Sequence, residues 1–61
     1  MYKVRIEKDY KVEIKEFSNR VEASKFASKA IDENYFSVRM WRVYKDGHNG
    51  AFIVNATNYW L

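Results

Sequence analysis

The chain has 61 residues, the length of one small domain, and it contains no cysteine, which excludes disulfides and cysteine-based metal sites. Eleven basic and eight acidic residues give a net charge of +3, a mildly basic balance that is compatible with a nucleic-acid partner without requiring one. The chain has no segment apolar enough to cross a membrane and no recognisable signal peptide, so we expect a cytoplasmic protein without a membrane partner.

The first segment, residues 2–14, alternates apolar and charged side chains, which predicts β-structure with one buried and one exposed face. A single strand of that length would be too long for so small a domain, so we predict a hairpin. A three-residue loop at residues 7–9 pairs Ile6 with Tyr10 and Val4 with Val12. It collects the apolar side chains on one face, namely Tyr2, Val4, Ile6, Tyr10, Val12 and Ile14. A two-residue loop at residues 8–9 would instead place Ile6 opposite Lys11, so we favour the longer loop.

A helix is predicted from about residue 19 to residue 33. Ser18 or Asn19 suits the N-cap, and Glu22 is the third helical residue after Asn19. Asn34 suits the C-terminal end. The apolar stripe at helical spacing consists of Ala23, Phe26, Ala27, Ala30 and Ile31.

A second hairpin is predicted from a strand at residues 35–45, a turn at residues 46–50 and a strand at residues 51–56. A loop of three or five residues places Phe52, Val54 and Ala56 beside Met40 and Tyr44. A four-residue loop places them beside Trp41 and Val43. We favour the first register because it unites the better apolar sets. Residues 58–61 either extend the last strand or fold against the core.

The elements follow the order ββαββ, which predicts a single α+β domain over residues 1–61. Its four-stranded, mainly antiparallel sheet has one helix packed on one face. Two strand orders, 2-1-3-4 and 1-2-4-3, make every neighbouring pair antiparallel with a right-handed crossover.

The sequence offers little for catalysis. His48, the only histidine, stands in a Gly-rich turn without a nearby nucleophile or second ligand, so we interpret it as an exposed turn residue. The same turn matches neither a calcium loop nor a phosphate-binding loop. The acidic residues alternate with lysines, as on a solvated face. We therefore predict a protein that is not an enzyme, with no catalytic residue, metal site or cofactor.

The sheet face away from the helix is the candidate functional surface. With the registers above it carries six basic and two acidic residues, and aromatic side chains lie among them; the full set is Lys3, Arg5, Glu7, Lys11, Glu13, Lys15, Tyr35, Ser37, Arg39, Trp41, Val43, Lys45, Ala51, Ile53 and Asn55. Cations with interleaved aromatics are typical of nucleic-acid-binding sheets. We predict a nucleic-acid-binding module whose contacts come from Lys3, Arg5, Lys11, Tyr35, Arg39, Trp41 and Lys45.

The alternative hypothesis is a protein–protein interaction module, such as a regulator or inhibitor. Lys and Glu alternating across strands also serve solubility, and an apolar patch on a small domain is typical of a protein interface. Its anchors would be Trp41, Val43 and Ile53, with Trp60 and Leu61 as further candidates. A homodimer with stacked sheets and the addition of a strand at a sheet edge are two forms of this hypothesis. Salt distinguishes the two classes, because only nucleic-acid binding weakens steeply as salt rises.

Overall fold

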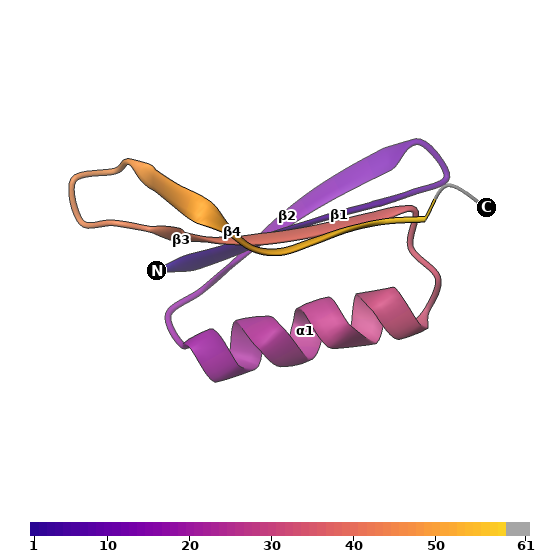
Figure 1. Cartoon of the computed structure of the whole chain (residues 1–61), viewed down its shortest axis with the longest axis horizontal. Helices are drawn as coiled ribbons and strands as arrows, with labels where there is room; N and C mark the ends of the chain where they lie inside the picture. Colours follow the sequence, from indigo (N-terminus) through magenta and orange to yellow (C-terminus); the bar gives the residue numbers. More distant parts are fainter. Residues whose placement is uncertain (59–61) are drawn as a thin grey trace.

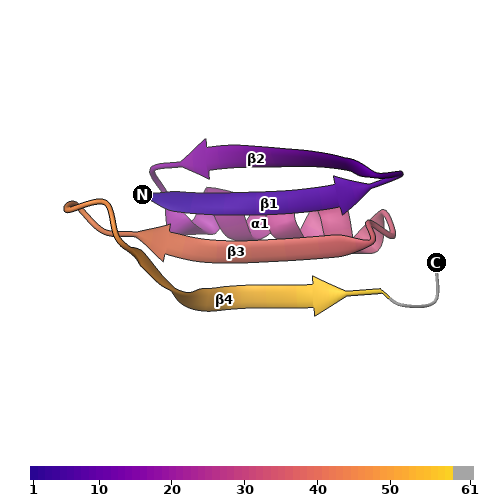
Figure 2. The ribbon, with the colours of Figure 1, turned by 90° about the horizontal axis from the view of Figure 1, so that it is seen from above.

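The computed structural model describes residues 1–58 and consists of one sheet and one helix (Figure 1). The elements are β1 (Tyr2–Lys8), β2 (Lys11–Phe17), α1 (Arg20–Asp32), β3 (Ser37–Val43) and β4 (Asn49–Thr57). The four strands form an antiparallel sheet in the order β2-β1-β3-β4, with α1 across one face (Figure 2). The α+β fold is therefore confirmed, with the first of the two predicted strand orders. No helix among residues 1–58 is long and apolar enough to span a membrane.

The ends of α1 are set by local signals. The side-chain oxygen of Asn19 accepts hydrogen bonds from the backbone N–H groups of Val21 (2.7 Å) and Glu22 (3.3 Å), which would otherwise lack partners in the first turn. After the helix, Asn34 adopts a left-handed conformation with φ of 60°, as is common just beyond a helix end. The predicted helix is thus confirmed to within one residue at each end.

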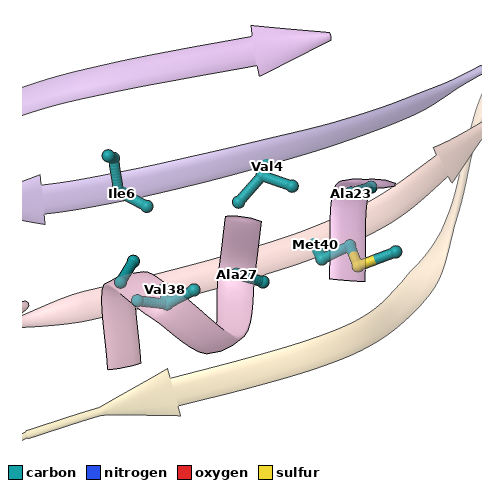
Figure 3. Packing of buried hydrophobic residues seen from close by; sticks show 7 residues of the cluster. Val4, Ile6, Ala23, Ala27, Val38 and Met40 are labelled. Carbon is teal, nitrogen blue, oxygen red and sulfur yellow. The ribbon is translucent and has the colours of Figure 1, made fainter. Parts of the chain in front are cut away.

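The core lies between α1 and the two central strands (Figure 3). Its buried residues are Val4 and Ile6 from β1, Val38 and Met40 from β3, and Ala23, Ala27 and Ala30 from α1. The alanines keep the helix close to the sheet because they have no bulk beyond Cβ. Phe26 packs at the margin of this cluster. Ile31 is 43% exposed, so its predicted place on the buried stripe is wrong.

The first hairpin differs from the predicted one. Its turn has two residues, Asp9 and Tyr10, and both have the positive φ that a type I′ turn requires (53° and 63°). The register consequently pairs Ile6 with Glu13, so the predicted pairing of Ile6 with Tyr10 is wrong. A shift of one residue exchanges the two faces of a strand. Ile14 therefore faces away from the helix.

Two aromatic rings favour this register. Phe17 lies opposite Tyr2 at the end of β2, and its ring centroid is 5.4 Å from that of Phe26 on α1. The amine of Lys15 stands over the same Phe26 ring, 5.0 Å from its centroid. On the helix side of β2, Phe17 thus packs against α1, and the long side chain of Lys15 extends over the Phe26 ring. The contact between the two phenylalanines replaces the predicted burial of Val12 and Ile14.

The second hairpin follows the favoured register only in part. Val54 lies opposite Met40 and Ala56 opposite Val38, on the helix side as predicted. The register then shifts twice towards the turn, first between Met40 and Trp41 and again between Trp41 and Val43. The first shift places Phe52 opposite Trp41, so the predicted position of Phe52 beside Met40 is wrong.

Candidate functional site: the open face of the sheet

We call the sheet face turned away from α1 the open face; Figure 2 looks onto it, with the helix behind the sheet. The registers place on it Val12, Ile14 and Glu16 from β2, Lys3, Arg5 and Glu7 from β1, Ser37, Arg39 and Trp41 from β3, and Phe52, Asn55 and Thr57 from β4. This set is less basic than predicted, with three cations and two carboxylates. Its centre is formed by β1 and β3, the two strands that also supply the core from their other face.

Four of the seven predicted binding residues come together at this centre. Lys3 lies directly opposite Trp41, and Arg5 lies directly opposite Arg39. Lys3 also forms an ion pair with Glu16 on the neighbouring strand, with 3.6 Å between Nζ and Oε1.

The other three predicted residues lie elsewhere. Lys11 pairs with Lys8 at the turn of the first hairpin and, by the alternation of β2, belongs to the helix side of the sheet. Tyr35 precedes β3 and packs against the core, with the Lys8 amine 5.1 Å from its ring centroid. Lys45 is exposed in the turn between β3 and β4. The predicted cluster of Tyr35, Arg39 and Trp41 on one face is therefore wrong.

An aromatic pair marks the β3–β4 side of the open face. The rings of Trp41 and Phe52 meet edge to face, with centroids 6.0 Å apart at an angle of 78°. The indole Nε1 of Trp41 donates a hydrogen bond to Oδ1 of Asn49 (3.0 Å), which fixes the orientation of the ring. Phe52 is 53% exposed, and the guanidinium carbon of Arg39 lies 5.7 Å from its centroid. The pair thus presents aromatic surface next to a cation.

Sequence reasoning missed Phe52 and Asn49 as members of this site. Their positions depend on the two register shifts in β4. The available signal was Gly50, because a glycine within a strand is typical of a bulge or of a close backbone approach. The structure shows such an approach: a Cβ atom at Gly50 would lie 3.1 Å from the ring of Tyr44 and 3.3 Å from the carbonyl oxygen of Arg42.

Two arginines face each other at the centre of the open face. Arg5 is directly opposite Arg39, although like charges in such positions destabilise a sheet. One guanidinium is partly neutralised, since Nη2 of Arg5 lies 3.2 Å from Oε1 of Glu7. Among the described residues, the buried Nε of Arg39 has no hydrogen-bond partner. A recess of about 220 Å³ is lined by these arginines together with Trp41, Asn49, Gly50 and Phe52. The recess therefore combines positive charge with exposed aromatic surface.

An apolar strip occupies the other side of the open face. Val12 and Ile14 on β2 are 51% and 52% exposed, and they flank the arginines on the side opposite the aromatic pair. Two of the predicted protein-interaction anchors, Val43 and Ile53, are less exposed than Val12 and Ile14. Val43 is partly buried, and Ile53, which is 38% exposed, lies where the β4 register shifts. Trp60 and Leu61 lie outside the described residues.

The turn between β3 and β4 is separate from this recess. His48 is exposed there, and its ring stacks on Tyr44 with centroids 4.5 Å apart. The backbone N–H of His48 donates to the carboxylate of Asp46 (3.0 Å), and the His48 ring contacts the same oxygen. These two interactions lower the pKa of Asp46 below its usual value of 3.8. Within residues 1–58, no three His, Cys, Asp or Glu side chains are grouped as a metal site requires.

Comparison with known proteins gives no assignment for this surface. No protein-family model matches the chain, and no curated protein or solved structure matches it. Its function is therefore inferred from the geometry of the open face.

Proposed function

We propose that the protein is a small, non-enzymatic module that binds single-stranded nucleic acid on its open face. One observation carries this proposal: Arg5 and Arg39 face each other beside the rings of Trp41 and Phe52. Two guanidinium groups held opposite each other favour an anion between them, because the anion removes their repulsion. A nucleic acid supplies that anion as phosphate and supplies bases that stack on the neighbouring rings.

Each residue has a distinct role in this proposal. Lys3, Arg5 and Arg39 contact the phosphates; Arg5 and Arg39 lie opposite each other on the two central strands, and Lys3 lies two residues before Arg5 on β1. Phe52 and Trp41 stack on bases, an interaction worth about 1–3 kcal/mol per base. Lys11, Tyr35 and Lys45 have no part in it, because the structure places them away from the recess.

The test measures the affinity of the protein for fluorescently labelled oligo(dT) and oligo(rU) by anisotropy over a series of salt concentrations. Phe52→Ala removes one stacking surface and should raise the dissociation constant roughly tenfold. Arg39→Gln removes one phosphate contact. It should make the plot of log affinity against log salt shallower by about 0.7.

The chain offers a matched control. Arg42 and Tyr44 form the same kind of contact, with 4.9 Å between the guanidinium carbon and the ring centroid. Arg42 lies opposite Tyr2 on the helix side of β3, and Tyr44 follows the strand. Arg42→Gln and Tyr44→Ala should therefore leave affinity and salt dependence unchanged.

Two results would contradict the proposal. One is an absence of binding to either oligonucleotide at low salt. The other is an equal effect of the Phe52→Ala and Tyr44→Ala variants, both confirmed as folded by circular dichroism. The protein-interaction hypothesis predicts a different pattern, namely capture of a protein partner that depends on Phe52 and is insensitive to salt.

A further inference from the structure

We propose that β2 pairs with β2 of a second copy, so that two chains form an antiparallel, two-fold symmetric homodimer with one continuous sheet. The state of β2 in the single chain supports this. Residues 11–16, which are all of β2 except Phe17, are exposed on both faces of the strand, and within residues 1–58 none of the fully buried core residues comes from β2. In Figure 1 the hairpin rises away from α1 towards its turn. β2 is also an edge strand of the sheet, and β1 is its one strand neighbour within residues 1–58.

The two edges of the sheet differ in regularity. β4 is the other edge strand, and its two register shifts interrupt the flat hydrogen-bonding edge that a partner would need. Such bulges are a common protection of sheet edges against association. β2 pairs with β1 over all seven of its residues without a shift, so its outer edge is straight and unprotected in this way.

The backbone of β2 restricts how two copies can pair. In a hairpin closed by a two-residue turn, Lys8 and Lys11 form the hydrogen-bonded pair next to the turn. Every second residue from Lys11 then bonds to β1, and the residues between direct their N–H and C=O groups to the free edge; these are Val12, Ile14 and Glu16. A two-fold axis at Ile14 lets that residue exchange both backbone hydrogen bonds with the partner's Ile14.

Charge selects this register over its neighbours. An axis at Ile14 places Glu13 opposite the partner's Lys15, and symmetry repeats the same attractive pair on the other side. An axis at Glu13 would place two glutamates opposite each other and Lys11 opposite the partner's Lys15. An axis at Lys15 would place two lysines opposite each other. Opposite charges in facing positions stabilise a strand pair and like charges destabilise it, so the pairing centred on Ile14 is preferred.

This dimer would also join the two open faces. Directly opposed residues in a strand pair point to the same side of the sheet, so both helices lie on one side and both open faces on the other. The half-exposed side chain of Ile14 then meets the partner's Ile14 in the middle of the joined surface, and Val12, which is also half exposed, lies beside it, opposite the partner's Glu16. Removal of this apolar surface from water would stabilise the dimer. The contact uses the strand edge, so it does not depend on the proposed nucleic-acid function.

The test is the mass of the protein in solution without nucleic acid, measured by sedimentation equilibrium over a range of concentrations. We expect the wild-type chain of 7.4 kDa to associate into a species of twice that mass. Glu13→Lys and Lys15→Glu each convert two attractive pairs into two repulsive pairs. Each should raise the dimer dissociation constant by roughly tenfold or more.

Two experiments that restore the opposite charges across the interface make the test specific to this register. A mixture of the Glu13→Lys and Lys15→Glu variants should dimerise, because opposite charges again face each other at both positions. The double variant E13K/K15E should dimerise on its own for the same reason. Lys25→Glu, on an exposed position of α1, is the charge control and should leave the mass unchanged. Circular dichroism checks that each variant folds, since within one chain Lys15 contacts the Phe26 ring and also forms an ion pair with Glu13 (3.8 Å between Nζ and Oε1).

Three results would overturn the inference. The first is a wild-type mass of a single chain at the highest soluble concentration. The second is a dimer that Glu13→Lys leaves unchanged, and the third is a double variant that stays monomeric although it is folded. A dimer that is lost only in the Phe52→Ala variant would point to sheets stacked through the open face and would also overturn it.

Discussion

The register of the first hairpin can be tested by comparing two valines. Val4 and Val12 would lie opposite each other on the buried face if the turn had three residues. In the structure Val4 is completely buried in the core, whereas Val12 is 51% exposed on the open face. Substitution of each valine by alanine removes the same two carbon atoms. The difference between the two losses of stability therefore reports the burial of each position.

The expected losses follow from that burial. Removal of two buried methylene equivalents at about 0.8 kcal/mol each, together with the cavity left in a packed core, makes Val4→Ala cost about 2–3 kcal/mol. Val12 buries about half of its side chain and leaves no enclosed cavity, so Val12→Ala should cost less than about 1 kcal/mol. A chain of this length has a total stability of roughly 3–9 kcal/mol. The Val4→Ala variant should therefore lose a large fraction of its stability.

Urea unfolding followed by circular dichroism measures both losses. The variants should share the wild-type dependence on urea and differ in midpoint, with the Val4→Ala midpoint clearly the lower. All proteins are compared at the same low concentration, so that self-association contributes equally. Losses that agree within a few tenths of a kcal/mol would refute the two-residue turn and the placement of β2 that follows from it.

Two further predictions concern the turns. Tyr10 is fully exposed and has a φ of 63°, a conformation that glycine adopts freely, that asparagine and aspartate tolerate and that is strained for tyrosine. Tyr10→Gly should therefore stabilise the protein by about 1 kcal/mol in urea unfolding, and a loss of stability would contradict the turn geometry. The pKa of Asp46 is lowered in the folded state, so the stability that its carboxylate contributes is present above its usual pKa of 3.8 and is lost as pH falls through the lower folded value. An NMR titration of the Asp46 carboxyl should therefore give a midpoint below 3.8, and Asp46→Asn should remove this acid dependence of stability. A midpoint at or above 3.8 would show that the His48 contacts do not persist in solution.

Half of the candidate site could be predicted because two strands have unambiguous faces. In β1, Val4 and Ile6 alternate with Lys3 and Arg5, which assigns these charged residues to the open face for any length of the hairpin turn. The same holds for Arg39 and Trp41 in β3, where the buried apolar residues are Val38 and Met40. These strands lie in the middle of the sheet and are covered by the helix on one side. Their patterns therefore report burial directly.

The edge strands could not be predicted in the same way. β2 alternates as regularly as β1, but Val12 and Ile14 face water, and Lys11, Glu13 and Lys15 lie on the helix side. A period-two pattern defines two faces without saying which one is buried, and one residue more or less in the turn exchanges them. In β4, the register shift between Met40 and Trp41 brings Phe52 to the open face, and the pattern of the sequence does not locate that shift.

The sequence by itself determined the elements, their order and the ends of the helix, because each depends on residues close together in the chain. Asn19 caps α1 through the next three residues, Asn34 ends it, and Gly47 takes the positive φ of the last turn. Only the tertiary structure decided which face of β2 packs. Phe17 and Phe26 meet from different elements, and this contact can be formed in one register only. The energy of this contact arises only when the sheet and the helix come together, so no pattern of neighbouring residues in the sequence predicts it.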